Sequence, residues 1–377
     1  MDNANYTSAL VRTVVESGAL EQDPFVLIDV GCGLGIDDAW RVFGTHLHAH
    51  GIDPQLREID RLRRAEHSDT VRYHAAFVGL PPDHPIRVRR IARVLEESYF
   101  EPFGRTSAWA AINRATESRE RSFYETNDWP GEELTSETIG LADLLRREDV
   151  ASVDFVKTDT DGGDLDVLLS FESMIAESGV LGFMVETPFT GSGDEGVHTF
   201  SNVDRLLKRH GFLLASLTVN RYSRAVLPAP FRHRIMAQTV WGQPQWGDLV
   251  YLRDAAHPDS GRFGALTATK VIKLACLYDL FGLPDCAVDT LLAHRSELED
   301  LIDVDAALDI LTPPLHGVQM TYREYLAAFE ADPTLFYPPP EAAPHIDALD
   351  AVPAVPPPSA TIRQRVKHLG ARMLGRV

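Results

Sequence analysis

The sequence contains little cysteine and no long hydrophobic run. Its three cysteines, Cys32, Cys276 and Cys286, lie far apart and match no metal-ligand spacing. We therefore expect reduced thiols in a cytoplasmic protein, rather than a disulfide framework or a structural zinc site. Because the sequence has no apolar stretch of about 18 residues and no basic segment followed by an apolar one at its N-terminus, we expect neither a membrane-spanning helix nor a secretory signal.

Positive charge is also scarce. The 377 residues include 36 Lys+Arg against 55 Asp+Glu, which gives a formal net charge of −19. Because general nucleic-acid binding needs a basic surface that neutralises phosphates, no nucleic acid is expected as a partner. A content of 44% hydrophobic and 24% charged residues is typical of a globular protein. The length predicts two to three domains at about 150 residues each.

Buried-strand patterns alternate with helical patterns along the first two thirds of the chain. Residues 25–30 form a continuous apolar run, which is typical of a strand buried on both faces. Further strands are predicted at 49–53, 70–78, 153–158, 180–186, 212–219 and 249–252, and helices at 38–43, 55–66, 165–176 and 201–210. The alternation predicts an α/β fold with a doubly wound, mainly parallel, seven-stranded Rossmann-like sheet. The last two strands are predicted to form an antiparallel hairpin at one edge.

Other segments surround this predicted core domain of residues 23–256. We expect an N-terminal helix within 1–22, an inserted lid over 80–136, a helical C-terminal unit over 257–331, a Pro-rich linker over 332–358 and a tail over 359–377. The tail has apolar residues at helical spacing with arginine and lysine between them. It is interpreted either as a basic amphipathic helix that reversibly contacts the inner membrane face or a partner enzyme, or as a solvated terminus.

A glycine-rich loop follows the first predicted strand. Gly31, Gly33 and Gly35 let the backbone turn tightly and approach a ligand at the carboxyl end of the sheet. A dinucleotide-binding fingerprint would need a third glycine at Ile36, so the spacing weakens a pyrophosphate site. Asp53 ends the second strand about 20 residues later, where a carboxylate can accept hydrogen bonds from ribose hydroxyls. NAD would use such an acid equally well, and a helix N-cap is the alternative role.

A cluster of carboxylates follows the strand predicted at 153–158. Asp159 and Asp161 could orient a substrate hydroxyl, accept its proton, or join Glu186 in binding a divalent cation. For Asp164 we favour capping of the following helix. His198, in a polar loop before the next helix, is either a general base or a surface histidine.

Two motifs carry a resemblance to a known family. Asp29 followed by G-x-G-x-G resembles motif I of S-adenosylmethionine-dependent methyltransferases. Residues 154–168 resemble the FkbM methyltransferases, whose fourth strand typically reads I-D-F-(I/L)-K-x-D-x-(E/Q)-G-x-E-x-x-V-L. The positions that match are Lys157, Asp159, Gly162, Val167 and Leu168, whereas Asp161 and Asp164 replace longer residues. Residues 138–145 resemble the family's T-x-x-L-D-D-L segment, with Ala142 at the first Asp. The resemblance runs from about 25 to 254 and does not obviously cover 80–136 or the C-terminal third.

The resemblance implies an S-adenosylmethionine-dependent O-methyltransferase acting on a hydroxyl of a sugar in a glycan or glycosylated natural product, or of a macrolide. The expected cofactor-binding residues are Asp29, Gly31, Gly33, Gly35, Asp53, Ala76, Phe77 and Asp159. The catalytic candidates are Asp159 first, then Glu186, Asp161 and His198, and Asp159, Asp161 and Glu186 are the ligands if Mg²⁺ takes part.

Acceptor-binding candidates are Arg105, Ser107, Trp109, Arg221 and Tyr222, because carbohydrate recognition uses aromatic faces and planar hydrogen-bonding groups. A packing loop is the alternative for 103–109. Two other functions stay open: an NAD(P)-dependent sugar-nucleotide oxidoreductase that uses the same crevice, and a non-catalytic cofactor-binding scaffold in a biosynthetic complex.

Overall fold

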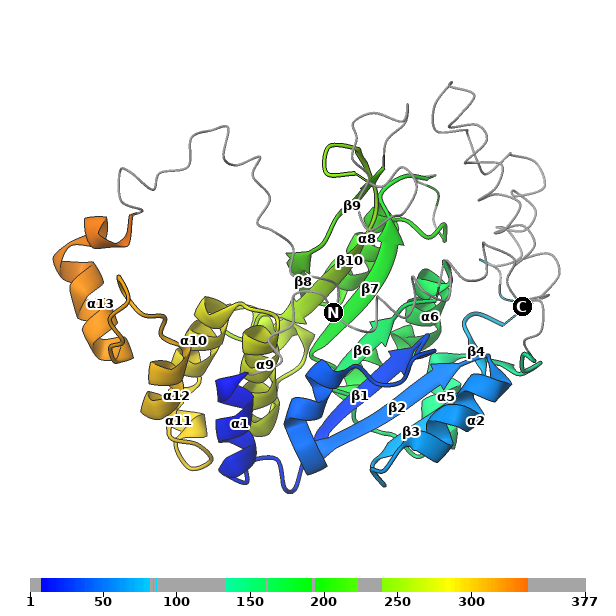
Figure 1. Ribbon diagram of the computed structural model, residues 1–377, viewed down its shortest axis with the longest axis horizontal. Helices are drawn as coiled ribbons and strands as arrows, with labels where there is room; N and C mark the ends of the chain where they lie inside the picture. The colour runs from blue at the N-terminus through cyan, green and yellow to red at the C-terminus, as the bar shows by residue number, and fades with distance from the viewer. Residues whose placement is uncertain are drawn as a thin grey trace, which may run out of the picture.

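A mixed sheet forms the centre of the protein (Figure 1). The computed structural model describes residues 8–81, 84, 86, 133–160, 162–191, 194, 196–222 and 239–337. The strand order is β3-β2-β1-β6-β7-β10-β8, with β9 paired to β10. The strands are β1 (Phe25–Val30), β2 (Leu47–Asp53), β3 (Val71–Ala75), β6 (Phe155–Thr158), β7 (Gly182–Pro188), β8 (Phe212–Leu217), β9 (Asn220–Tyr222) and β10 (Gln243–Arg253).

The pairing confirms the doubly wound, mainly parallel sheet. Neighbouring strands from β3 through β7 run parallel, whereas β10 is antiparallel to β7, β8 and β9. From β1 the chain moves outward through β2 and β3, and it then returns to place β6 on the other side of β1. Such a reversal opens a crevice at the carboxyl ends of β1 and β6, where open α/β sheets bind ligands.

Two details of the predicted sheet are wrong. The sheet has eight strands rather than seven, because 220–222 pair with the beginning of β10. The strand predicted over 70–78 is two strands. It ends as β3 at Ala75, and β4 (Phe77–Val78) pairs with β5 (Thr138–Ile139) in a separate two-stranded sheet.

Helices cover both faces of the sheet. One hydrophobic cluster includes residues of α1 (Ala9–Glu16), η1 (Asp38–His46), α2 (Leu56–Ala65) and α9 (Ala268–Leu280), and the other includes residues of α5 (Leu141–Arg147), α6 (Asp164–Phe171) and α8 (Phe200–Arg209). The other helices are η2 (Glu172–Met174), α7 (Ile175–Ser178), η3 (Ser260–Phe263), α10 (Pro284–Ala293), α11 (Arg295–Leu298), α12 (Val304–Leu311), α13 (Tyr322–Ala331) and η4 (Pro333–Phe336). No helix in these described ranges is both long and apolar enough to cross a membrane.

Several helix boundaries differ from the prediction. The element after the glycine loop is a 3₁₀ helix whose backbone breaks at Gly44, where φ is 57°. The helix predicted at 165–176 ends at Phe171 and continues as η2 and α7. The predicted linker begins later than residue 332, because Asp332 caps η4 by accepting a hydrogen bond from the Thr334 N–H. The rest of the linker and the tail lie outside the described residues, as does most of the predicted lid.

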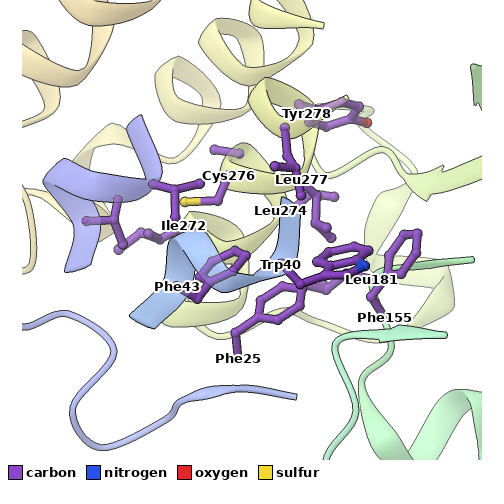
Figure 2. Close-up of a cluster of buried hydrophobic side chains, with 14 of the residues drawn as sticks. Phe25, Trp40, Phe43, Phe155, Leu181, Ile272, Leu274, Cys276, Leu277 and Tyr278 are labelled. Atoms are coloured by element: carbon purple, nitrogen blue, oxygen red, sulfur yellow. The ribbon is translucent and has the colours of Figure 1, made fainter. Parts of the chain in front are cut away.

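The C-terminal helices, predicted as a helical unit over 257–331, share a hydrophobic core with the sheet. Figure 2 shows Phe25 of β1, Trp40 and Phe43 of η1, and Phe155 of β6 beside side chains of α9. The rings of Phe25 and Phe43 stack with centroids 4.2 Å apart. Ten of the thirteen residues of α9 are buried, which explains why this helix has apolar side chains around most of its circumference.

A buried charge cluster fastens α9 to the sheet. Asp154, which is fully buried just before β6, lies 2.7 Å from the ammonium group of Lys270 and 3.0 Å from that of Lys273. The same carboxylate accepts a hydrogen bond from the N–H of Val26 in β1. Burial lowers the pKa of Lys270, and the Asp154 carboxylate opposes that shift. Removing one partner would leave a buried charge uncompensated, so α9, β1 and β6 are held as one body.

Two stacked histidines lie at the other side of the sheet. His50 Nδ1 of β2 is 3.0 Å from His74 Nε2 of β3, and both residues are buried. Burial lowers the pKa of His50 to about 4, and His74 and Arg72 lower it further. Burial also lowers the pKa of His74, against the attraction of Glu148.

These histidines predict a loss of stability in mild acid. Because the pKa of His50 in the folded state lies below its unfolded value of about 6.5, its stabilising contribution is complete above that pH and is lost as the pH falls toward 4. Denaturant unfolding at pH 7 and at pH 4.5 should show the free energy of unfolding falling more in the wild type than in His50→Gln, by on the order of 2 kcal/mol. His67→Gln, at an exposed histidine, is the matched control and should behave like the wild type. Equal pH dependence of all three proteins would contradict the assignment.

Candidate cofactor crevice

Acidic side chains from five strands meet at one edge of the sheet. Asp29, Asp53 and Glu186 lie on β1, β2 and β7, and Asp159 directly follows β6. The fifth, Asp248, lies on β10 opposite Glu186. Since β10 is antiparallel, its amino-terminal half faces the carboxyl ends of the parallel strands. Asp248 is not among the residues predicted from the sequence, although it is an acid directly before the predicted strand 249–252.

The glycine loop packs directly against the chain that leaves β6. Gly31 has φ +87°, and a Cβ placed there would lie 1.9 Å from the carbonyl oxygen of Asp159. The N–H of Asp159 in turn donates to the carbonyl of Val30. A Cβ on Gly33 would lie 3.1 Å from Oδ2 of Asp53. The absence of side chains therefore lets the loop bring the ends of β1, β2 and β6 together.

Cys32, between the first two glycines, anchors this loop. Its N–H donates to the carbonyl of Ile52, and its side chain is buried. Burial raises the pKa of the thiol, and the charges of Asp29 and Asp53 raise it further. Cys32 is thus a packed, protonated thiol, as expected for a reduced cysteine.

Asp29 binds a lysine of the protein itself. Its buried carboxylate accepts a hydrogen bond from Lys157 Nζ at 2.9 Å, and the same ammonium group lies 3.7 Å from Asp159. Burial lowers the pKa of Lys157, but the two carboxylates outweigh that effect and raise it, so the lysine stays charged. Burial raises the pKa of Asp29, and Lys157 opposes this shift. Asp29 therefore shapes the crevice through Lys157, and its predicted role in cofactor binding stays a prediction.

The two carboxylate oxygens of Asp53 lie in different surroundings. Oδ1 accepts a hydrogen bond from the Gln55 N–H at 2.9 Å, which shapes the turn into α2, whereas Oδ2 faces Gly33 of the glycine loop. The alternative role of Asp53 as the helix N-cap is wrong, because Gln55 holds the cap position of α2, and the ligand role of Asp53 stays a prediction. Ala76, which is buried, donates its N–H to the Asp53 carbonyl, and Phe77 follows at the start of β4. Ala76 is thereby held beside the end of β2, and the cofactor-binding roles of Ala76 and Phe77 stay predictions.

Glu186 and Asp248 lie opposite each other on β7 and β10. Burial raises the pKa of Asp248, as does the nearby charge of Asp159, while a hydrogen bond from the Thr218 hydroxyl opposes the shift. Burial raises the pKa of Tyr222 on β9, and Glu186 raises it too. Tyr222 is therefore near Glu186, and its acceptor-binding role stays a prediction. Its neighbour Arg221 uses Nη1 to bind the carbonyl of Gly242.

Asp164 departs from its predicted role. It is the first residue of α6 rather than its cap, and the cap position is held by Gly163. Its side chain is fully buried and accepts a hydrogen bond from the Thr160 hydroxyl at 3.0 Å, while Oδ1 has no hydrogen-bond partner. His198 lies beside this turn, with Nδ1 3.1 Å from the carbonyl of Gly162.

The other predicted positions fall outside the described residues. These are Asp161, Arg105, Ser107 and Trp109. Within the ranges that the structure describes, no three His, Cys, Asp or Glu side chains are grouped so as to hold a metal ion. The predicted Mg²⁺ ligands include Asp161, so the full set stays a prediction.

Part of the chain matches the model of a known protein family. Residues 84–214 match the model of the Methyltransferase FkbM domain, which confirms the resemblance seen in the sequence. The match includes most of the segment 80–136 that was expected to lie outside the resemblance, and it stops short of residue 254. It supports S-adenosylmethionine-dependent methyl transfer. A search of curated proteins found no match.

Several solved structures resemble this one at low identity. Magnesium protoporphyrin IX methyltransferase from Synechocystis, with bound SAM, is 9% identical over 65% of this chain and 80% of that chain, with a TM-score of 0.28. Precorrin-6y C5,15-methyltransferase from Geobacter metallireducens is 12% identical over 66% and 90%, with a TM-score of 0.29. The 1,6-didemethyltoxoflavin-N1-methyltransferase from Burkholderia thailandensis is 11% identical over 66% and 79%, with a TM-score of 0.26. We therefore infer function from the family match and the crevice geometry.

The contact between the glycine loop and the chain after β6 can be tested with Gly31→Ala. The added Cβ would clash with the Asp159 carbonyl and strain a backbone at positive φ, so the free energy of unfolding should fall by about 2–4 kcal/mol. Gly282→Ala is the matched control, because Gly282 also has positive φ (+75°) but no atom within 4 Å of its Cβ position. It should lose only about 1–2 kcal/mol. Similar losses in both variants, measured by urea unfolding, would show that the close approach is not needed.

Proposed function

We propose that this chain, whose residues 84–214 match the FkbM methyltransferase domain, is an S-adenosylmethionine-dependent O-methyltransferase acting on a sugar hydroxyl. The observation that carries the cofactor site is the meeting of the glycine loop with Asp53 and with the chain after β6. The loop provides a surface without side chains beside a carboxylate. That surface suits a nucleoside with a flat base and a ribose diol.

The residues of the crevice fit this cofactor in shape and in charge. S-adenosylmethionine supplies an electrophilic methyl group on a positively charged sulfur. Oδ2 of Asp53 would accept hydrogen bonds from the ribose hydroxyls, while Ala76 and Phe77 would lie near the base. Asp29, Asp53, Asp159, Glu186 and Asp248 would give this part of the crevice an acidic character, which suits a cationic ligand.

The acidic character of the crevice favours a neutral polyol as the methyl acceptor. Carboxylates accept hydrogen bonds from hydroxyl groups, whereas an anionic acceptor would be repelled by the crevice. Asp159 is our first candidate for orienting the acceptor, because it follows β6 at the crevice and Lys157 lies 3.7 Å from its carboxylate. Transfer to oxygen needs no covalent enzyme intermediate. Catalysis by this chain would therefore rest on aligning the acceptor oxygen and on removing one proton.

Cofactor identity is tested by calorimetry with Asp53 variants. S-adenosylhomocysteine should bind the wild type, and Asp53→Ala should weaken that binding by roughly 1–3 kcal/mol through the loss of charge-assisted hydrogen bonds. Asp53→Asn keeps an oxygen for the Gln55 N–H and should also bind more weakly, which separates ligand contact from folding of the turn. Asp60→Ala, at an exposed aspartate on α2, is the control and should bind normally.

The outcome also decides between the two enzyme classes. Saturable NAD binding without S-adenosylhomocysteine binding would replace our proposal with the oxidoreductase. Unchanged affinity in both Asp53 variants would show that the ribose lies elsewhere.

The role of Asp159 is tested with Asp159→Asn. Removing the negative charge should slow methyl transfer by about 10²–10⁴-fold while the thermal unfolding midpoint stays within a few degrees of the wild type. The readout is transfer of labelled methyl groups to glycan extracts of the producing organism. Near-normal turnover would remove Asp159 from the mechanism. Cofactor binding by the wild type without transfer to any extract would favour the scaffold.

A further inference from the structure

We propose that the basic tail of this chain, residues 359–377, docks as a helix on the exposed apolar face of α13 and η4 of the same molecule. The inference goes beyond the proposed function, because neither the cofactor crevice nor methyl transfer enters it. It assigns a partner to apolar side chains that α13 and η4 present to solvent.

The helix α13 has an apolar face at helical spacing. The positions i, i+3, i+4 and i+7 are Tyr322, Tyr325, Leu326 and Phe329. Tyr322 packs against the hydrophobic cluster on one side of the sheet, yet none of the ten residues of α13 is buried. In Figure 1, α13 lies at the periphery of the molecule, with α10, α11 and α12 between it and the sheet. The helix therefore turns most of its apolar side chains toward solvent.

The short helix η4 extends this apolar surface. Its Phe336 ring meets the rings of Tyr325 and Phe329 edge-on, with centroids 4.9 and 5.3 Å apart. Leu326, Phe329 and Leu335 are still exposed over 40%, 48% and 41% of their surfaces. We call these five residues the α13 face. A short helix is marginal in water unless its apolar face is covered, and neighbouring exposed apolar side chains mark interaction sites.

The charge around the α13 face is negative. Glu324 and Asp332 lie near the two ends of α13, where Glu324 accepts a hydrogen bond from the Thr321 hydroxyl and Asp332 accepts one from Thr334. Residues 284–337 include eleven Asp+Glu against two Lys+Arg. A second copy on this face would bring two units of like charge together, and an anionic membrane would also be repelled. The face therefore fits a basic segment.

The tail has the complementary chemistry. It contains five Lys+Arg and no Asp or Glu. Its apolar stripe, at spacing i, i+4, i+7 and i+11, consists of Ile362, Val366, Leu369 and Met373, and basic residues lie along both halves of that stripe. Docking of an amphipathic helix by this stripe would cover the α13 face and bring the basic residues toward the acids at its ends.

The linker is long enough for the tail to dock within one molecule. The 21 residues 338–358 follow Tyr337, which comes directly after Phe336 of the α13 face. A chain of this length spans about 25 Å when flexible and about 65 Å as extended polyproline II, whereas a helix of the 19 tail residues is about 28 Å long. The tail can therefore reach along α13 in either direction. A linker of this kind gives an effective concentration on the order of millimolar, so even a weak contact is populated.

Hydrogen exchange of the full chain, followed by mass spectrometry, tests this contact. A helix as short as the tail is marginal in water, so its amides should be protected only while it is docked. The double substitution Leu326→Gln with Phe329→Gln should make the tail amides exchange at least about tenfold faster than in the wild type. Leu292→Gln is the matched control, because Leu292 of α10 is similarly exposed (39%) and lies outside the α13 face. Equal tail exchange in the double variant and the control would overturn the proposal.

Substitutions in the tail make the reciprocal test if the α13 variant fails to fold. Val366→Gln with Leu369→Gln should make the amides of α13 exchange several-fold faster, whereas Gln364→Asn, outside the apolar stripe, should not. Raising the salt concentration from about 50 mM to about 500 mM should also speed tail exchange in the wild type, because screening weakens the attraction between opposite charges. Unchanged α13 exchange in the double tail variant would likewise overturn the contact.

Dilution and added vesicles distinguish the other occupants. Docking within one molecule predicts tail exchange that is independent of protein concentration. Protection that disappears on dilution would replace the proposal with a contact to a second copy. Protection that appears only when phosphatidylglycerol vesicles are added would replace it with membrane binding. Tail amides of the wild type that exchange as fast as those of a synthetic 359–377 peptide would overturn the proposal outright.

Discussion

The pairing of β1 with β6 is the contact on which the rest of this structure depends. It joins the two halves of the doubly wound sheet, and buried lysine–carboxylate pairs hold it at both ends. Before β6, Asp154 receives Lys270 and Lys273 from α9. At the opposite end, Lys157 of β6 binds Asp29 of β1. The crevice opens directly beyond this second pair, so the strand contact that closes the fold also places the site.

Most of the lysines in this chain take part in these ion pairs. Three of the five lysines form ion pairs inside the fold: Lys270 and Lys273 are buried, and Lys157 is largely buried. Burying an ammonium group has a large desolvation cost, and a neighbouring carboxylate offsets this cost only where the geometry of the pair is fixed. The pairs therefore specify which strand and helix lie together more than they raise overall stability.

The alternation of buried-strand and helical patterns in the sequence made most of the fold predictable. The apolar run at 25–30 and the glycines after it placed the first strand and the loop correctly, because local periodicity and glycine spacing are determined by nearby residues. The pattern did not predict β9 or the division of 70–78. Both depend on which distant backbone supplies hydrogen bonds: β10 for 220–222, and β5 for 77–78.

The sequence by itself determined the kind of site: a glycine loop, an acid at the end of the second strand and a carboxylate cluster after another strand. Only the tertiary structure decided how these groups are used. In the folded protein, Asp29 pairs with Lys157, and Asp248 lies opposite Glu186 on an antiparallel strand. Asp164, predicted as a helix cap, is instead a buried carboxylate in the first turn of α6. These roles depend on burial and on partners more than 30 residues away, and a one-dimensional spacing does not encode either.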